Sequence, residues 1–348
     1  MIKYLGSKRL LLPAILDIVG GLGRESGGVS SVVDIFSGTS RVGHALKRAG
    51  LRVLANDHNA YAATLARCYV AADRERVERD ALRLIDEFST LPGRDGWFTD
   101  TYARRSRFFR EENAARIEAI RDAIEAKALP MDLRAVLLVS LMEAADRVDS
   151  TTGVQMAYLK QWATRSGRPL ALRLPDVLPR ATAGKGEAYE QNALDLAGTV
   201  EADIAYLDPP YNSHKYKSNY HIWETLVRWD QPEVYGVACK RIDCRDGDNP
   251  FNSARRCLSA MAHVIRSLRV RHLVVSFNNE GRIAKDEMIA LLSERGEVEV
   301  IEHDYKRYVG AQIGIHNPSG EKVGQISHLR NVEYIFVVRN AAPTCAET

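Results

Sequence analysis

The sequence feature that most limits the fold is a short apolar run that ends in two consecutive prolines. Residues 203–207 have the pattern of a buried parallel strand, and Asp208-Pro209-Pro210-Tyr211 follows them directly. Proline has a fixed φ and no N–H group, so two prolines in a row cannot continue a β-ladder. The chain must therefore leave the sheet at this point, at the strand end where open α/β sheets bind their ligands.

The groups at this strand end suit the binding of an exocyclic amine. The Asp208 carboxylate and the Pro209 carbonyl are both acceptors, so together they can hold the two hydrogens of an –NH2 group. Tyr211 offers a flat face on which a planar ring can stack. Such a site orients the amine and stabilises positive charge that develops on its nitrogen. Taken alone, the stretch fits equally well with a structural alternative, in which a helix-capping aspartate is followed by a rigid proline turn.

A second strand end lies near the start of the chain. Residues 32–36 predict a buried strand, residues 37–40 a tight turn, and residues 41–49 a helix. This order is typical of a nucleotide fold in which the backbone approaches a ligand closely. The turn is neither a GxGxxG nor a GxxxxGK[ST] motif, so dinucleotide and P-loop sites are not indicated. The acid at the strand end, Asp34, suits a ligand amino group instead.

The next predicted strand, residues 51–55, ends in Asn56-Asp57. An acid about 20 residues beyond the glycine turn can bind ribose hydroxyls. Asp57 has this spacing from Gly38, and we favour the ribose role for it. The alternative is that Asp57 caps the helix predicted from about residue 60 to residue 71.

From about residue 73 to residue 185 the alternation of strands and helices stops. Long charged helical runs, for example residues 114–128 and 132–145, replace it. A run of helices that interrupts an alternating chain indicates an inserted subdomain. We therefore expect a catalytic domain formed by residues 1–72 and 186–348, with residues 73–185 as a helical insert.

The insert contains a segment that suits nucleic acid. Residues 102–110 interleave arginines with aromatic rings, a mixture that fits phosphate contact and base stacking, with Arg104, Arg105 and Arg107 as phosphate candidates. The alternative is a helix whose arginines are solvated while Phe108 and Phe109 lie in the core.

Two further stretches are candidates for DNA contact. The polar turn at residues 150–155 contains Thr151, Thr152 and Gln155, which we predict to contact bases. Lys215 and Lys217 follow the proline stretch, in a position to approach the phosphates that flank an extruded base.

Three motifs in order give the chain a resemblance to a known family. Residues 3–8 (KYLGSK), residues 34–38 (DIFSG) and residues 208–211 (DPPY) together resemble the Dam-like adenine-N6 DNA methyltransferases. The resemblance extends from residue 3 to a strand-like run near residue 338. It implies a mixed seven-stranded Rossmann-like methyltransferase sheet, a terminal hairpin-like pair of strands at residues 298–302 and 332–338, and a helical target-recognition subdomain at residues 73–185.

The resemblance also implies the cofactor and its contacts. The cofactor is S-adenosyl-L-methionine, whose ammonium group needs an acceptor. The residues that match the family's cofactor segments are Tyr4, Lys8, Asp34, Phe36, Gly38, Asp57, Asp195 and Leu196. Of these, Lys8 is expected to approach the active site, and Asp195 and Leu196 to hold the cofactor's adenine.

The predicted reaction is direct methyl transfer to adenine N6 in double-stranded DNA, after the base has left the stack. The catalytic residues are Asp208, Pro209, Pro210 and Tyr211, and no metal is required. The alternatives are an RNA adenine-N6 methyltransferase and a non-catalytic nucleic-acid-binding subunit with the same fold. Cytosine N4 also remains open as a target, because the motif presents an amine without saying which ring bears it.

Composition adds limits but no function. The 45% hydrophobic and 27% charged residues are typical of a soluble globular protein, and the net charge of +3 is too small to argue for nucleic acid by itself. The five cysteines are scattered, which indicates neither a zinc site nor a disulfide framework. We expect a reduced, cytoplasmic protein without a membrane segment or a signal peptide. Its partners are double-stranded DNA and, as the resemblance allows, a cognate restriction endonuclease.

Overall fold

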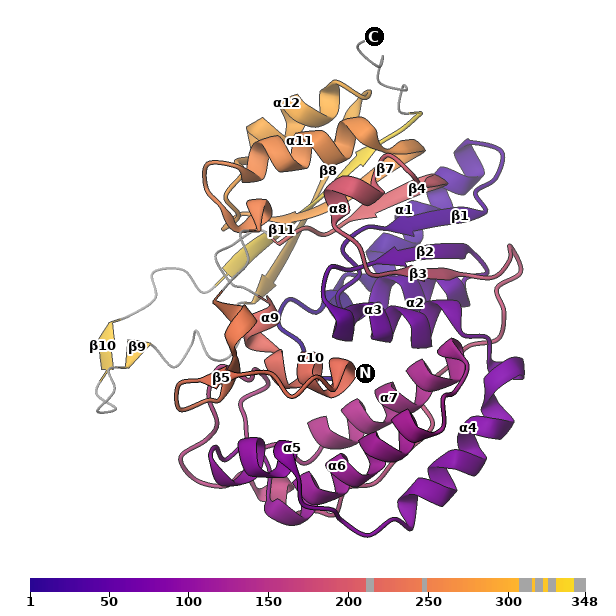
Figure 1. The fold of residues 1–348 in the computed structure, drawn as a ribbon. Coiled ribbons are helices and arrows are strands. Elements are labelled where there is room, and N and C mark those ends of the chain that lie inside the picture. The colour runs from indigo at the N-terminus through magenta and orange to yellow at the C-terminus, as the bar shows by residue number, and fades with distance from the viewer. Residues whose placement is uncertain (211–215, 246–248, 307–314, 317–321, 325–329, 341–348) are drawn as a thin grey trace. The chain divides into compact units, whose positions relative to one another are not determined.

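The computed structural model describes residues 1–210, 216–245, 249–306, 315–316, 322–324 and 330–340. The chain forms two compact units (Figure 1). The first comprises Met1–Leu196 and His214–Asp248, and the second comprises Ala197–Ser213 and Asn249–Thr348.

Three parallel strands form the sheet of the first unit. They are β1 (Ser31–Asp34), β2 (Arg52–Asn56) and β3 (Glu187–Tyr189), in the order β3-β2-β1. The strands β1 and β2 are almost entirely buried, as expected for parallel strands covered on both faces. Helices α1 (Leu12–Glu25), α2 (Arg41–Arg48) and α3 (Ala60–Ala66) connect or flank these strands. The strand–turn–helix opening predicted from the sequence is therefore present.

Helices and loops fill the chain between α3 and β3. The helices are α4 (Arg74–Ser89), α5 (Trp97–Thr99), α6 (Glu111–Ala126) and α7 (Met131–Asp146), with a π-helical turn at Asp100–Arg104 and a 3-10 turn at Thr164–Gly167. Residues 73–185 are all described, and none of them belongs to a named strand. Helix α7 is apolar on nearly every side and is buried, so this region shares the core of the first unit. Its role in target recognition stays a prediction.

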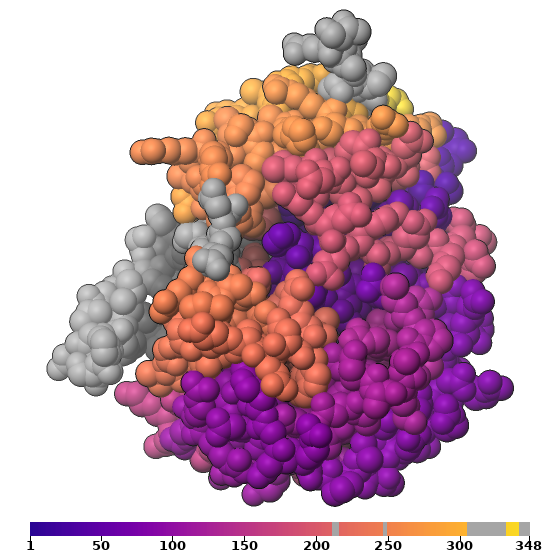
Figure 2. Space-filling view, in the orientation of Figure 1, coloured from indigo at the N-terminus to yellow at the C-terminus, as the bar shows by residue number. Residues whose placement is uncertain are grey.

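The later part of the first unit contains α8 (Ala193–Leu196), α9 (Tyr216–Asn219), α10 (His221–Arg228) and the short strands β5 (Val234–Tyr235) and β6 (Lys240–Arg241). Of these elements, α10 packs on α7. The buried Arg121 of α6 donates to the carbonyl oxygens of Leu226 (2.7 Å) and Val227 (3.1 Å), near the end of α10. Figure 2 shows the orange surface of this segment directly against the violet surface of the helical region.

Four strands form the sheet of the second unit. They are β4 (Glu201–Leu207), β7 (Arg269–Asn278), β11 (Arg330–Val338) and β8 (Val298–Lys306), in that order. The strands β4 and β7 are parallel, whereas β11 is antiparallel to both β7 and β8. Helices α11 (Cys257–Ser267) and α12 (Lys285–Ser293) accompany them, and a separate short pair is formed by β9 (Ile315–His316) and β10 (Lys322–Gly324).

The strand order corresponds to a mixed seven-stranded sheet, which confirms the predicted Rossmann-like methyltransferase fold. The antiparallel pairing of β8 with β11 confirms the predicted hairpin-like arrangement. Among the residues that the structure describes, no helix is long and apolar enough to cross a membrane.

Candidate active site

The carboxyl ends of β1, β2 and β3 are tied together by one buried side chain, Asn56. Its Nδ2 donates to the carbonyl oxygens of Ile35 (3.0 Å), just after β1, and Gln191 (3.2 Å), just after β3. Its Oδ1 accepts from the N–H of Gln191 (3.1 Å). The three strand ends therefore form one platform. Asn56 was not among the predicted site residues, although an amide at the end of a buried strand is a signal for such a role.

Asp57 shapes the turn on this platform. One oxygen of its carboxylate, Oδ2, accepts from the N–H of Gly38 (3.0 Å), and Oδ1 accepts from the N–H of Asn59 (2.9 Å). Burial raises the pKa of Asp57, and these hydrogen bonds oppose the rise because they favour the ionised form. Asp57 thus joins the turn after β1 to the residue that precedes α3. Both the predicted ribose contact and the capping alternative would use this carboxylate. Its hydrogen bonds to Gly38 and Asn59 show that it organises the turn.

Gly38 is required by conformation and by space. Its φ is +51°, in the left-handed region that disfavours side chains. A Cβ placed there would lie 3.3 Å from the hydroxyl oxygen of Tyr4. The backbone of the turn can therefore approach a neighbouring group closely only because the residue is glycine.

The other predicted cofactor residues have different environments. Asp34 is buried at the end of β1, Lys8 is buried in the 3-10 turn Lys8–Leu10, and Phe36 is half-buried. In α8, Asp195 is exposed, whereas Leu196 is buried. All of them belong to the first unit, and their roles toward a cofactor stay predictions.

Tyr4 anchors the opening segment to the helices that follow the proline stretch. Its ring stacks on Tyr220 (centroids 4.7 Å apart, planes 13° apart) and on Tyr216 (5.4 Å, 14°). Its hydroxyl lies 3.5 Å from that of Tyr61 in α3, and the neighbouring N–H of Leu5 donates to the Tyr220 hydroxyl (2.6 Å). The opening segment, α3 and α9–α10 are thereby held together.

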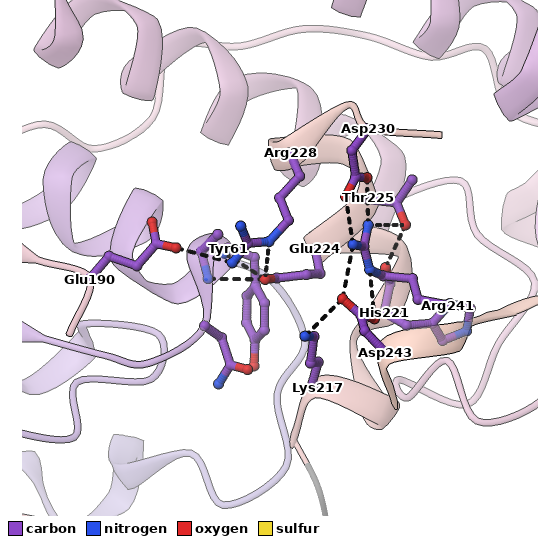
Figure 3. A network of polar contacts seen from close by, with 12 residues as sticks. Tyr61, Glu190, Lys217, His221, Glu224, Thr225, Arg228, Asp230, Arg241 and Asp243 are labelled. Carbon is purple, nitrogen blue, oxygen red and sulfur yellow. Dashed lines mark hydrogen bonds and ion pairs between the residues drawn. The ribbon is translucent and has the colours of Figure 1, made fainter. Parts of the chain in front are cut away.

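A polar network fastens α10 to the start of α3 (Figure 3). The buried Glu224 accepts from the N–H groups of Tyr61 (3.1 Å) and Ala60 (3.3 Å), and Arg228 donates to the same carboxylate (2.7 Å). The first N–H groups of a helix lack internal partners, so a carboxylate there satisfies them and complements the helix dipole. Asn59, which binds Asp57, is the residue just before this helix. Glu224 therefore stabilises the start of the helix that follows the Asp57 turn, a role that the sequence did not reveal.

The predicted amine site follows β4 in the second unit. The last ladder pair of β4 joins Leu207 to Val275, and the chain then leaves the sheet at Asp208 as the prolines require. Pro209 is buried, and Asp208 and Pro210 are half-buried. Tyr211 lies outside the described residues. The strand end and its break are as predicted, and the catalytic roles stay predictions.

The predicted phosphate-contacting arginines differ from one another. Arg104 already pairs with Asp95 (2.8 Å) and Glu111 (3.0 Å), which raises its pKa. Arg105 is exposed, and Arg107 donates to the Lys160 carbonyl oxygen (3.0 Å). Phe108 and Phe109 are buried, so the alternative that placed these rings in the core describes the structure. Base stacking on these two rings would require them to leave the core.

The predicted base-reading residues are also unequal. The Gln155 side chain is buried and accepts from the Ile222 N–H (2.8 Å) at the start of α10. Thr151 is buried as well, and its hydroxyl donates to Asp149 (2.6 Å). Thr152 is exposed. Because Thr152 is the exposed residue of the three, its side chain is the one that a base can reach.

Of the two lysines after the proline stretch, the structure describes Lys217. Lys217 in α9 pairs with Asp243 (2.9 Å). Lys215 lies outside the described residues. Their predicted contacts with phosphates stay predictions.

The seven-stranded sheet, with acids and a glycine turn at its strand ends, defines an α/β protein of the methyltransferase type. The chain belongs to the D12 class of N6 adenine-specific DNA methyltransferases, whose sequence profile matches residues 4–289. This match confirms the resemblance found in the three motifs. The family implies a methyl donor.

Named relatives agree with the family. The chain is 28% identical over 323 residues to modification methylase StsI of Streptococcus sanguinis and 29% identical over 334 residues to type II methyltransferase M.FokI of Planomicrobium okeanokoites. It is 27% identical over 314 residues to type II methyltransferase M.NlaIII of Neisseria lactamica. Each match covers 88% of this chain. The matches cover 48% of StsI and 49% of M.FokI, so the chain spans about half the length of these two, but 92% of M.NlaIII.

Proposed function

We propose that this chain transfers a methyl group from S-adenosylmethionine to N6 of adenine in double-stranded DNA. The observation that carries the proposal is the position of Asp208 and Pro209 directly after β4 in a chain of the adenine-specific family. A carboxylate and a carbonyl at the carboxyl end of a parallel strand provide two acceptors for one amino group.

The residues of the β1–β3 platform fit S-adenosylmethionine. The buried Asp34 supplies an acceptor for the ammonium of the methionine part, Asp57 supplies acceptors for the ribose hydroxyls, and Asp195 and Leu196 supply an acceptor and an apolar surface for the adenine. The cofactor provides an electrophilic methyl group. The Asp57 carboxyl group is also the partner of the Gly38 N–H, so it holds the turn in shape for this role.

The chain's own part in the reaction is to position the target amine. In the free base the lone pair of this nitrogen is delocalised into the ring, so the amine is a poor nucleophile. Asp208 and the Pro209 carbonyl accept its two hydrogens and thereby favour a tetrahedral nitrogen whose lone pair can react. They also stabilise the positive charge that develops there. The base must leave the duplex stack for this geometry, and Tyr211 provides the face on which it stacks. We also place the chain in the cytoplasm, with double-stranded DNA and a cognate restriction endonuclease as partners.

Transfer of labelled methyl groups tests the proposal. The purified chain is incubated with labelled S-adenosylmethionine and either duplex DNA or structured RNA, and the products are digested to nucleosides. We expect label in N6-methyladenine from DNA. Label only in RNA supports the RNA alternative, label in N4-methylcytosine changes the target ring, and no label in any nucleoside supports a non-catalytic subunit.

A further inference from the structure

A pair of arginines shares one tryptophan on the surface of the helical region. The guanidinium carbons of Arg107 and Arg110 lie 4.8 Å and 4.3 Å from the centre of the Trp162 ring. Cations within about 6 Å of an indole ring are attracted to its face. Arg110 is exposed, and Arg107 and Trp162 are half-buried. We call these three residues the arginine–tryptophan surface.

Neither of these arginines has a carboxylate partner among the residues that the structure describes. Arg104, from the same segment, pairs with Asp95 and Glu111. Two cations held against one ring without a counterion repel each other, and an anion relieves this repulsion. The exposed cations Lys160 and Arg168, in the segment that carries Trp162, likewise form no ion pair in the described part of the chain.

The surface stands on a fixed framework. Phe108 lies between the two arginines in the sequence, and its side chain is buried. Its carbonyl oxygen accepts from the Ser150 N–H (2.8 Å). The Ser150 hydroxyl accepts from the Ala163 N–H (3.1 Å), next to Trp162. The arginines, the tryptophan and the start of the polar turn at residues 150–155 are thus held together. The exposed Thr152 follows Ser150 in the same turn.

We propose that the arginine–tryptophan surface binds the phosphate backbone of duplex DNA and sets the position of the helical region on it. Guanidinium groups match phosphate oxygens in geometry and keep their charge. This inference rests on the proposed function, and it replaces Arg104 by Arg110 as a phosphate contact. Arg107 remains one. Backbone contacts of this kind position a protein without specifying sequence, which leaves sequence choice to neighbouring residues such as Thr152.

The test measures binding of a fluorescent duplex against salt concentration. Arg110→Gln and Arg107→Gln are each expected to reduce the slope of log affinity against log salt by about 1, and the double variant by about 2. Arg110→Lys keeps the charge and is expected to keep the slope. The matched control is Arg104→Gln, which removes the same group from the same segment and is expected to keep the wild-type slope. Equal slopes for wild type and the double variant overturn the proposal, as does an equal loss in Arg104→Gln.

Two accompanying measurements separate failure of this surface from failure of the function. Affinity for S-adenosylmethionine is measured for every variant as a check of folding, and it should not change. Methyl transfer by the wild type is measured on the same duplex. Transfer with an unchanged slope in the double variant rejects the surface alone. A reduced slope without wild-type transfer supports the surface and rejects the enzyme, and a wild type that does not bind the duplex rejects both.

Discussion

At the scale of single residues, Asp57 combines two tasks in one carboxylate. It holds the Gly38 N–H and the Asn59 N–H, and it is the proposed ribose contact. We expect Asp57→Ala to weaken S-adenosylmethionine binding by about 1–3 kcal/mol, the usual loss for a hydrogen bond to a charged group. Asp57→Asn keeps one acceptor, and its loss should be smaller. Calorimetry on folded variants measures both, and an unchanged affinity in Asp57→Ala would remove this residue from the site.

Asp146, at the end of α7, makes the stability of the folded protein depend on pH. Its Oδ2 accepts from the Lys3 N–H (3.1 Å), and burial is the main cause that raises its pKa from 3.8 to about 6. As the pH rises from about 4 to about 6, the unfolded chain ionises this group while the folded chain resists. The folded state therefore loses stability across this window, on the order of 1–3 kcal/mol.

Asp146→Asn removes this loss and keeps an acceptor for the Lys3 N–H. The variant is expected to melt at a higher temperature than the wild type at about pH 8, and the difference should shrink at about pH 4.5. Thermal unfolding at the two pH values measures it. A difference that is the same at both would show that ionisation of Asp146 does not affect folding.

The elements that carry some of the proposed site residues could be predicted from the sequence because their signals are local. Asp34, Gly38 and Asp57 lie within one strand–turn–helix pattern and the strand that follows it. Gln155 is different, because its side chain is held by a distant partner. The Gln155 side chain binds the N–H of Ile222, 67 residues away in the sequence, and no local pattern contains that contact.

At the scale of elements, α10 supports the platform through Glu224. Removing the charge by Glu224→Gln weakens the cap on α3 and the bond to Arg228. We expect the free energy of unfolding to fall by about 1–2 kcal/mol, as for the loss of a helix cap. S-adenosylmethionine binding should weaken as well, because the Asp57 turn precedes α3.

Glu190→Gln is the matched control for Glu224→Gln. Glu190 binds the same Arg228 (3.1 Å), but none of its hydrogen bonds or ion pairs within the described part of the chain reaches α3. It should change neither stability nor cofactor affinity measurably, since exposed ion pairs contribute little. Denaturant unfolding and calorimetry compare the two variants. Equal effects would show that the loss of a negative charge beside Arg228, and not the loss of the cap on α3, destabilises the protein.

Elements were easier to predict than their packing. The apolar runs predicted β1, β2 and β4, because buried strands have a strong local pattern, and the family resemblance implied β8 and β11. The short β3 was missed as a strand since its three residues are only half-buried. The interruption by helices was predicted from the missing alternation, yet the sequence did not show that α7 would share a core with α3.

At the scale of the whole molecule, we assign binding of the methyl donor and presentation of the target amine to different parts of the chain. The proposed donor contacts belong to the first unit, and Asp208 belongs to the second. The two tasks should therefore respond to different substitutions. Asp208→Ala removes an acceptor for the target amine and none of the proposed contacts to the donor.

The most direct test measures donor binding and methyl transfer in the same Asp208→Ala protein. We expect wild-type affinity for S-adenosylmethionine by calorimetry, together with a loss of about 100-fold or more in transfer to duplex DNA. Base-resolved mapping of plasmid DNA from a modification-free host should find N6-methyladenine with the wild type and none with the variant. Transfer at the wild-type rate by folded Asp208→Ala protein would contradict the account, because the amine would then be activated elsewhere.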